Sequence, residues 1–429
     1  MAFSISWTDY PEPADSDEYM KGCFLQRVQK DGETGEFSSL YNFISGDNYP
    51  VLRLLERDYS EKIDFIYIDP PYNTGKKFVY NDSFSGGSAQ DRHSVWLSFM
   101  KRRLVIAREL LSETGCIFIA IGNEELYHLK LLCDMIFGEE NFVNDFMWLC
   151  GKGKKDSHSR TLEQSTLCYA KNKRRLGEFA EFQETEWATV NPDNDERGPW
   201  FSGSISFSEK RSNPSHPNYF EIVSPSGVHW KRQWLISREK MDELLRENKI
   251  YWGPAPEFSN VPRSKVFNGQ KTKIIPKNII DGANCNGTTG AETAIAGTIS
   301  TGSSLTGSFR IGTTRDAQNY VDKLLGIKNA FDNPKPVGLI EHLISITAMK
   351  DDITVLDFFA GSGTTMEAVY RLNQLDGGKR RCILVQKPEK IEIEGHPFTD
   401  LSQLCLERCK RAGLPESQLT EFLLVLPSK

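Results

Sequence analysis

Four consecutive residues, Asp69-Pro70-Pro71-Tyr72, combine the groups that could hold a planar aromatic amine. The carboxylate of Asp69 can accept one amine hydrogen, and the carbonyl of Pro70, whose direction the proline ring restricts, can accept the other. Two acceptors stabilise the positive charge that develops on the nitrogen during attack on an electrophile. Tyr72 offers a face for stacking, which contributes ~1–3 kcal/mol per nucleic-acid base. All four are candidate catalytic residues; the alternative is a proline-rich strand end with an incidental acid.

A glycine-containing motif, Asp357 to Thr365 (DFFAGSGTT), has the pattern of a strand that turns into a helix. Glycines let a ligand approach the backbone, and a helix N-terminus favours an anionic group such as a carboxylate. Gln386 ends the next expected strand, where it can hydrogen-bond a ribose hydroxyl less strongly than an acid would. Met366 replaces the third glycine of the dinucleotide fingerprint, and the P-loop lysine is missing. The motif therefore favours a smaller nucleoside cofactor.

Both motifs stand where an expected strand ends. Short β-branched and aromatic runs predict buried strands over 62–69, 115–121, 353–359 and 382–386. Apolar residues at helical spacing predict helices over 96–111, 124–137, 337–348 and 364–373. This alternation predicts a parallel sheet covered on both faces, and ligands bind such a sheet beyond the carboxyl ends of its strands. The sequence thus predicts one α/β sheet in two sequence blocks, with both motifs in one cleft.

The segment between the two blocks has a different composition. It holds many aromatic and turn residues, and its stretch 282–314 is rich in glycine, serine and threonine, which indicates a long loop or linker. We therefore expect an N-terminal arm over 1–40, a first half of the α/β domain over 41–175, an inserted module over 176–330 and a second half over 331–429.

The net charge of −6 argues against a general affinity for polyanions. A specific phosphate contact needs only a local basic surface, however, and the stretch 152–175 supplies one, with Lys152, Lys154 and Lys155 at its start. The alternative is a solvated charged face.

Composition places the chain among soluble globular proteins, with 39% hydrophobic and 26% charged residues. No apolar run approaches the ~20 residues that span a bilayer, and the polar N-terminus lacks the apolar core of a signal peptide. We therefore expect a cytoplasmic protein. The nine cysteines include no CxxC pair, and Cys405 with Cys409 fits one helical face better than a zinc site, so we expect free thiols and no metal.

Together the two motifs resemble those of beta-class DNA amino-methyltransferases, in which the catalytic motif comes first and the cofactor loop last. Several flanking stretches are similar to the Mod subunits of type III restriction–modification systems, which occur in prokaryotes and phages. They are Gly46-Asp47-Asn48, KIDFIYIDPPYNTG (62–75), FGEENFVNDFMW (137–148), CYAKN (168–172), NPKPVGLIEHL (333–343) and VLDFFAGSGTT (355–365). The resemblance covers residues 43–175 and 333–410 well, and the central module only loosely.

The resemblance implies a Rossmann-like class I methyltransferase sheet with a circularly permuted motif order. It implies S-adenosylmethionine as the cofactor and the N6 amine of a flipped adenine in double-stranded DNA as the target. The implied cofactor-binding residues are Asp357, Phe359, Ala360, Gly361, Ser362, Gly363, Thr364, Lys335, Pro336 and Gln386. The resemblance implies that the central module is a target-recognition domain. Within it, Arg211 and Arg232 join the three lysines as candidate DNA contacts; the alternative for each arginine is a role in the core or on the surface. The family also implies a homodimer.

Three departures from the family pattern matter. The chain is shorter than typical type III Mod subunits, which argues against a restriction subunit as a partner. Gly122-Asn123 stands where related chains often carry an acid, so Asn123 receives no catalytic role. Gln386 replaces the common acid at the end of its strand.

Other functions fit parts of this pattern: methylation of cytosine N4, of RNA or of a protein glutamine, and DNA binding by a regulator without activity. Asp-Pro-Pro-Tyr, rather than Ser-Pro-Pro-Tyr, favours adenine over cytosine in the family that the chain resembles. The aromatic-rich module favours nucleic acid over a glutamine side chain, and the intact motifs argue against an inactive regulator. A measurement of methyl transfer to DNA separates these functions.

Overall fold

The computed structural model describes residues 6–28, 37, 39–75, 84, 89–151, 158–184, 188–268, 271–282, 311–347, 349–391 and 396–427. The chain divides into a larger unit, Met1–Ala180 with Ile275–Lys429, and a smaller unit, Glu181–Ile274. Among the described helices, none combines the length and the apolar content that crossing a membrane requires.

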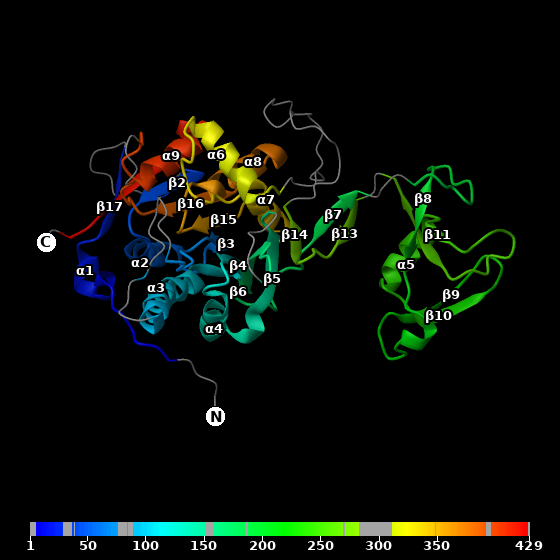
Figure 1. The fold of residues 1–429 in the computed structure, drawn as a ribbon. Coiled ribbons are helices and arrows are strands. Elements are labelled where there is room, and N and C mark those ends of the chain that lie inside the picture. Colours follow the sequence, from blue (N-terminus) through cyan, green and yellow to red (C-terminus); the bar gives the residue numbers. More distant parts are fainter. Residues whose placement is uncertain are drawn as a thin grey trace. The chain divides into compact units, whose positions relative to one another are not determined.

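A mixed sheet forms the centre of the larger unit (Figure 1). Among the described residues it has ten strands, in the order β1-β17-β2-β16-β15-β3-β4-β6-β5-β14. The bounds are β1 Phe24–Arg27, β2 Tyr41–Ser45, β3 Ile63–Ile68, β4 Leu111–Ile121, β5 Phe142–Leu149, β6 Glu163–Ala170, β14 Ile279–Asp281, β15 Thr354–Asp357, β16 Arg381–Gln386 and β17 Leu419–Val425. The strands from β17 to β4 run parallel, whereas β6 is antiparallel to β4 and β5, and β1 is antiparallel to β17.

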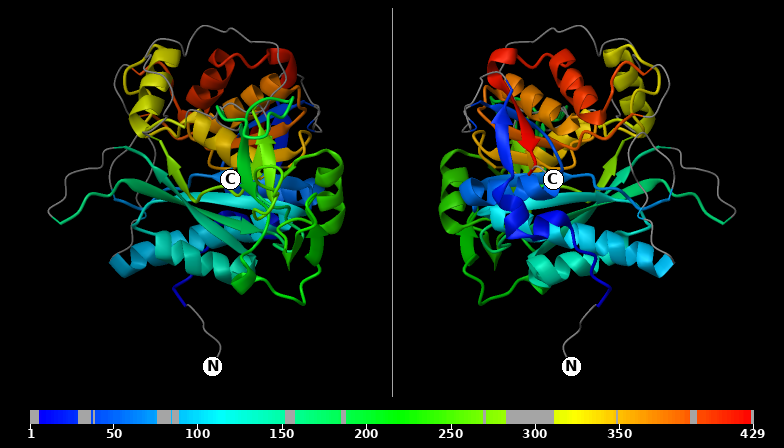
Figure 2. Two further views of the ribbon diagram at one scale, coloured as in Figure 1. Left: turned by 90° about the vertical axis from the view of Figure 1, so that its right-hand side faces the viewer. Right: turned by 90° about the vertical axis from the view of Figure 1, so that its left-hand side faces the viewer.

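Helices lie on both sides of this sheet, as Figures 1 and 2 show. One side carries α2 (Asn48–Tyr59), α3 (Ala89–Leu110) and α4 (Leu126–Phe137). The other carries α6 (Thr314–Leu325), α7 (Val337–Ile346), α8 (Thr364–Asp376) and α9 (Leu401–Arg411). The remaining helical pieces of this unit are α1 (Asp17–Lys21) and the 3-10 turns Pro13–Asp15, Glu139–Asn141 and Glu416–Gln418.

The central strands are apolar on both faces because helices bury each face. In β3, Ile66 belongs to one buried cluster with Trp96 of α3, whereas Phe65 and Tyr67 belong to the opposite cluster with residues of α7 and α8. The predicted Rossmann-like α/β sheet, covered on both faces, is confirmed. The expected strands correspond to β3, β4, β15 and β16, although β4 begins earlier than expected, at Leu111.

Two neighbouring parallel strands carry the two chemical motifs. β15 pairs with β3, with Val355 opposite Phe65. From β15 the chain continues through α8 to β16 on one side, and from β3 it continues through α3 to β4 on the other. The strand order reverses at this point, which leaves a crevice beyond the carboxyl ends of the two strands. The segments that follow Ile68 and Asp357 are therefore neighbours in space.

The described part of the N-terminal stretch packs on the larger unit, which differs from the arm that the sequence suggests. Arg102 of α3 forms ion pairs with Asp9 and Asp15, at N–O distances of 2.9 and 2.8 Å, and Trp7 donates a hydrogen bond to Ser98. β1 extends the sheet beyond β17. Polar contacts of this kind produce no apolar periodicity, so the sequence could not predict that this stretch packs on the larger unit.

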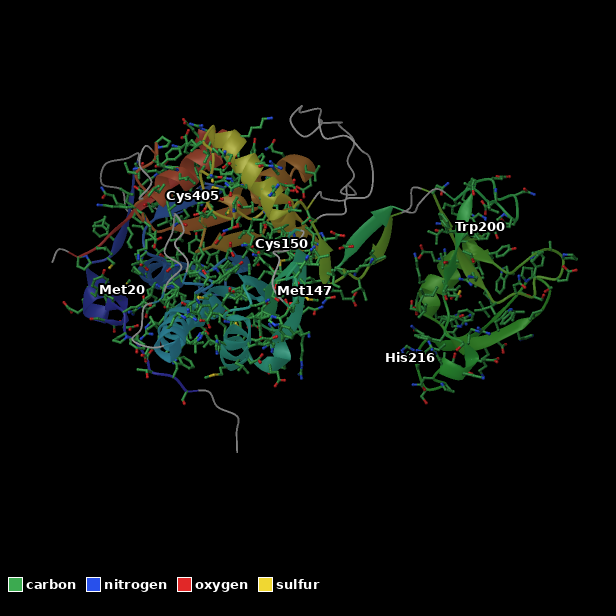
Figure 3. The ribbon with its side chains drawn as sticks, in the orientation of Figure 1. Met20, Met147, Cys150, Trp200, His216 and Cys405 are labelled. Atoms are coloured by element: carbon green, nitrogen blue, oxygen red, sulfur yellow. The ribbon has the colours of Figure 1, made fainter. Side chains whose placement is uncertain are left out.

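In its described residues, the smaller unit consists of short strands, one α-helix and a 3-10 turn. Its elements are β7 (Glu181–Glu184), β8 (Trp200–Ser204), a 3-10 turn (Glu209–Arg211), β9 (Tyr219–Val223), β10 (His229–Gln233), α5 (Arg238–Arg246), β11 (Ile250–Tyr251), β12 (Arg263–Phe267) and β13 (Lys271–Ile274). Aromatic residues such as Trp234 and Trp252 form its core, and Trp200, labelled in Figure 3, is buried beside Tyr251.

The inserted module expected over 176–330 is wider than this unit. β14 pairs with β5, and α6 packs with α9, so both elements belong to the larger unit. Residues 283–310, which make up most of the expected loop 282–314, lie outside the described residues.

Candidate active site

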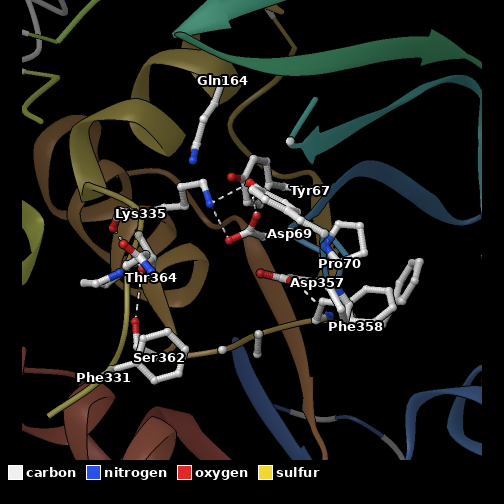
Figure 4. A pocket seen from close by; sticks show the side chains of 18 of the residues that line it. Tyr67, Asp69, Pro70, Gln164, Phe331, Lys335, Asp357, Phe358, Ser362 and Thr364 are labelled. Carbon is white, nitrogen blue, oxygen red and sulfur yellow. Dashed lines mark hydrogen bonds and ion pairs between the residues drawn. The ribbon is translucent and has the colours of Figure 1, made fainter. Parts of the chain in front are cut away.

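Both motifs line one cavity of about 1100 Å³ (Figure 4). The turn after β3 contributes one part of its wall, and the turn between β15 and α8 contributes another. The predicted site residues that line it are Asp69, Pro70, Pro71, Tyr72, Lys335, Asp357, Phe359, Ala360, Gly361, Ser362, Thr364 and Gln386. Gly363 and Pro336 do not belong to this lining.

Asp69 is held by two neighbouring side chains. Its Oδ1 accepts a hydrogen bond from the Tyr72 hydroxyl at 2.8 Å, and its Oδ2 forms an ion pair with Nζ of Lys335 at 2.5 Å (Figure 4). The same Nζ also donates to the Tyr72 hydroxyl oxygen at 3.0 Å. The side chain of Lys335 is 8% exposed and that of Asp69 is 27% exposed, so the acid stays open to the cavity. Lys335, expected to hold the cofactor, lines the cavity and directs its ammonium group at this acid.

The backbone around Tyr72 is also fixed. Nε1 of Trp96, a fully buried residue of α3, donates a hydrogen bond to the Pro71 carbonyl at 2.8 Å. The ring of Tyr72 lies against Gly122, where a Cβ atom would come within 2.8 Å of a ring carbon. Glycine at this position therefore leaves the space that the tyrosine ring occupies, and an acid there would displace the ring.

The glycine turn is closed by its own backbone and by Gln386. Gly363 donates its N–H to the Ala360 carbonyl at 2.7 Å, and Gly361, with a φ of +54°, donates its N–H to Oε1 of Gln386 at 2.7 Å. Nε2 of Gln386 donates to the Lys387 carbonyl at 3.1 Å. Gln386, expected to meet a ribose hydroxyl, thus ties the turn to the end of β16.

A buried arginine from α9 supports the turn from outside the cavity. Nη1 of Arg408 donates to the Ser362 carbonyl at 3.0 Å and to the Thr364 hydroxyl at 2.8 Å, and Nη2 forms an ion pair with Glu367 at 2.9 Å. Arg408 and Glu367 are both fully buried. The position of the turn therefore depends on a buried ion pair.

Gly363 provides both an unusual backbone conformation and space. Its φ is +87°, in the left-handed region, and a Cβ atom there would lie 2.8 Å from Sγ of Cys409 and 3.1 Å from Sγ of Cys405. Cys405 is labelled in Figure 3. The eight cysteines in the described part of the chain are free thiols. Two of them pack directly beneath the turn.

We expect Gly363→Ala to lower the free energy of unfolding by about 2–5 kcal/mol, from the left-handed conformation and from overpacking against α9. Gly377→Ala is the matched control, because Gly377 has a φ of +73° and no atom within 4 Å of the added Cβ. It should lose only the conformational part, about 1–2 kcal/mol. Urea denaturation of both variants measures the difference. Equal losses would show that the contact with the two cysteines carries no energy.

Asp357, the last residue of β15 and the first of the glycine-containing motif, is 2% exposed. Its Oδ2 accepts a hydrogen bond from the Thr365 hydroxyl at 2.6 Å, and its Oδ1 accepts one from the Phe359 N–H at 2.9 Å. Burial nevertheless raises the pKa of Asp357 from 3.8 to about 7, because the loss of hydration outweighs these two hydrogen bonds.

This raised pKa predicts a pH-dependent stability. The folded protein binds the Asp357 proton more tightly than the unfolded chain does, and this difference contributes to the free energy of unfolding. The contribution is fully present below the unfolded pKa of 3.8 and is lost as the pH rises to about 7. Asp357→Asn cannot ionise, so its stability relative to the parent should increase by up to ~1.4 kcal/mol per pH unit across this window. Urea denaturation at pH 5 and pH 8, without cofactor, tests this. An equal difference in the free energy of unfolding between Asp357→Asn and the parent at pH 5 and at pH 8 would contradict this prediction.

The sequence did not predict a chain of hydrogen-bonded polar groups on the cavity wall. Nδ2 of Asn48 donates to the Phe358 carbonyl at 2.7 Å, and Oδ1 of Asn48 accepts from Nε of Arg103 at 2.6 Å. Arg103 forms an ion pair with Glu12 at 2.7 Å, and its guanidinium lies 3.5 Å from the centre of the Phe99 ring. All five residues line the cavity. Asn48 and Phe358 stand in stretches that carry the family resemblance, whereas Glu12, Phe99 and Arg103 had no signal in the sequence.

The candidate DNA contacts lie in different settings. Lys152, Lys154 and Lys155 lie outside the described residues. Arg211 is exposed in the 3-10 turn of the smaller unit. Arg232 is only 8% exposed, and its guanidinium lies 5.0 Å from the centre of the Trp230 ring. This burial argues against a phosphate contact by Arg232.

Comparison with known proteins agrees with the resemblance seen in the motifs. The chain is 33% identical over 372 residues to the type III restriction-modification enzyme StyLTI Mod subunit of Salmonella typhimurium, covering 80% of this chain and 51% of that one. It is 36% identical over 384 residues to the EcoPI Mod subunit of Escherichia phage P1, covering 81% and 57%. The chain thus spans about half the length of these two relatives.

A relative of more similar length is the type II methyltransferase M.KpnI of Klebsiella pneumoniae. It is 31% identical over 389 residues, which cover 84% of this chain and 82% of that protein. A family model described as DNA methylase matches residues 63–389, a range that includes both motifs and the segment between them. The match over this range shows that the chain belongs to the DNA methylase family.

Proposed function

We propose that the protein is a site-specific DNA methyltransferase that transfers a methyl group from S-adenosylmethionine to the N6 amine of a flipped adenine. The observation that carries this proposal is the shared cavity: an acid–proline–proline–tyrosine turn and a glycine turn line it together, from neighbouring strands. The first turn supplies acceptors for an amine, and the second supplies a backbone that a nucleoside cofactor can approach.

The residues of the cavity fit S-adenosylmethionine. Gly361 lines it with a positive φ and no side chain, and Phe359 supplies an aromatic wall. The N-terminus of α8 favours the cofactor carboxylate. Cavities of about 300–1,000 Å³ suit single small ligands, so a volume of about 1100 Å³ is ample for a cofactor with part of a target base. S-adenosylmethionine would supply an electrophilic methyl group on a positively charged sulfur.

The proposed mechanism assigns the amine to Asp69 and Pro70. Tyr72 and Lys335 hold the Asp69 carboxylate in one orientation, and each of its oxygens keeps a free lone pair for an amine hydrogen. The Pro70 carbonyl accepts the second hydrogen. The two acceptors stabilise the charge that grows on nitrogen, and the fixed ring of Tyr72 stacks on the base. Positioning and electrostatics supply the acceleration.

The smaller unit is proposed to read the DNA sequence, with exposed cations such as Arg211 on phosphates. Lys152, Lys154 and Lys155 remain proposed phosphate contacts as well. A homodimer stays a prediction from the resemblance.

The test is expression in a bacterial host without DNA methylation, followed by single-molecule sequencing of the host genome. We expect N6-methyladenine at one short sequence, and no modification in a strain that carries Asp69→Ala. Modification of cytosine N4 would correct the target base. Unmodified DNA in a strain that makes folded, cofactor-binding protein would overturn the proposal.

A further inference from the structure

A group of polar side chains, two of them buried and two histidines partly exposed, lies behind the Asp69–Tyr72 turn, outside the cavity lining. At its centre is Glu125, which directly precedes α4 and is 0% exposed. Its Oε1 accepts a hydrogen bond from Nδ2 of Asn73 and lies 2.6 Å from Nδ1 of His93, and its Oε2 lies 2.7 Å from Nδ1 of His128. The Asn73 contact is also 2.6 Å. Three side chains thus converge on one carboxylate.

Asn73 connects this group to the turn. It follows Tyr72 directly, is fully buried, and has a φ of +59°, a conformation that asparagine tolerates better than most residues. Its side-chain amide holds that conformation through Glu125. On the other side of Tyr72, Trp96 holds the Pro71 carbonyl. The tyrosine is therefore anchored at both neighbours, one by an indole and one by a carboxylate.

The same three groups could in principle bind a metal ion, because one ligand atom from each of His93, Glu125 and His128 lies within 4.8 Å of the others. Their contacts favour hydrogen bonds instead. The nitrogen–oxygen distances of 2.6 and 2.7 Å are those of charge-assisted hydrogen bonds, with the proton on each Nδ1. The amide of Asn73 also occupies Oε1, so both carboxylate oxygens already have donors.

We propose that Glu125 is a positioning residue for methyl transfer, acting through Asn73 on Tyr72 and Asp69. This inference rests on the proposed function. Glu125 touches neither the cavity nor the reacting groups. It fixes the backbone that follows Tyr72, whose hydroxyl in turn orients the acid. Removal of the carboxylate takes an acceptor at 2.6 Å from the buried amide of Asn73, whose contact with the Arg92 carbonyl is longer, at 3.4 Å. A buried donor that loses its short hydrogen bond shifts or distorts its surroundings.

The experiment measures steady-state methyl transfer to unmethylated bacterial genomic DNA. Glu125→Ala should lower kcat by about 10-fold to 100-fold, since small misplacements of reacting groups cost that much, while the KM for S-adenosylmethionine stays unchanged. Glu125→Gln keeps an oxygen acceptor for Asn73 and should restore most of kcat. Glu140→Ala, which removes an exposed carboxylate after α4, is the matched control and should behave as the parent.

Asn73→Ala and the double variant Asn73→Ala/Glu125→Ala, together with Glu125→Ala and the parent, form a double-mutant cycle. If Glu125 acts through Asn73, the double variant loses no more kcat than either single variant. Losses of kcat that multiply in the double variant would overturn the inference. A Glu125→Gln variant with no higher kcat than Glu125→Ala, or variants that change only the KM for S-adenosylmethionine, would also overturn it. If the protein binds one equivalent of Co²⁺ and His128→Ala abolishes this binding, the group is a metal site and the inference is wrong. An inactive parent protein would refute the proposed function rather than this inference, because every variant is read against the parent.

Discussion

Asp69→Ala should lower the rate of methyl transfer by about 100-fold or more, because the developing charge on the amine loses its carboxylate acceptor. Cofactor binding should be retained, since the glycine turn is held by other contacts, to Gln386 and Arg408. Single-turnover transfer to unmethylated DNA measures the chemical step, and calorimetry with S-adenosylmethionine measures binding.

Two further variants sharpen this result. Asp69→Asn keeps one oxygen acceptor but loses the ion pair with Lys335, so it should fall between the parent and Asp69→Ala. Asp58→Ala removes an aspartate from an exposed ion pair with Arg57 at the end of α2 and should leave the rate unchanged. Full activity of Asp69→Ala would refute the mechanism.

Arg408→Met should lower the free energy of unfolding by about 3–5 kcal/mol, the usual cost of leaving one member of a buried ion pair alone. Glu367 keeps Tyr320 and Arg371 as partners, which limits the loss. The Ser362 carbonyl also loses its donor, so the turn should loosen and the affinity for S-adenosylmethionine should fall. Urea denaturation and calorimetry give the two quantities.

The cause can be separated with a second substitution. Arg408→Met/Glu367→Met removes both charges of the pair and should be more stable than Arg408→Met, because the buried carboxylate that lost its buried counter-charge is removed as well. Arg371, which also loses Glu367, is 43% exposed and can be hydrated instead. A double variant as unstable as the single one would assign the loss to the unsupported turn instead. Arg411→Met, on the same helix, breaks a largely exposed pair with Glu407 and a hydrogen bond to the Leu325 carbonyl, and should cost only about 1–2 kcal/mol.

The centre of the fold could be predicted because its strands are buried on both faces. β3 alternates between two cores, so its residues from Phe65 to Ile68 appear in the sequence as one continuous apolar run. The antiparallel strands β5 and β6 carry exposed or partly exposed residues such as Asn144 and Glu163, which weaken such a run. β1 has no buried residue, so nothing in its pattern distinguishes it from a loop.

The candidate site was predictable where one short stretch contains the whole chemical arrangement. The Asp69–Tyr72 turn and the glycine turn are of this kind, and the parallel sheet brings them together. Lys335 and Gln386 were also predicted as site residues, but their contacts with Asp69 and Gly361, and the role of Arg408, were not, because these partners lie in distant parts of the chain. The spacing of residues along a sequence carries no information on which lysine pairs with which acid across a sheet.

The strands at the two ends of the smaller unit have a consequence for specificity. β7 and β13 are antiparallel partners, and Glu181, the first residue of the unit, lies opposite Ile274, the last. A domain whose ends are neighbours can be exchanged without redirecting the surrounding chain. If this unit reads the DNA sequence as proposed, transplanting the corresponding segment of a relative would give an enzyme that modifies new sites with unaltered chemistry.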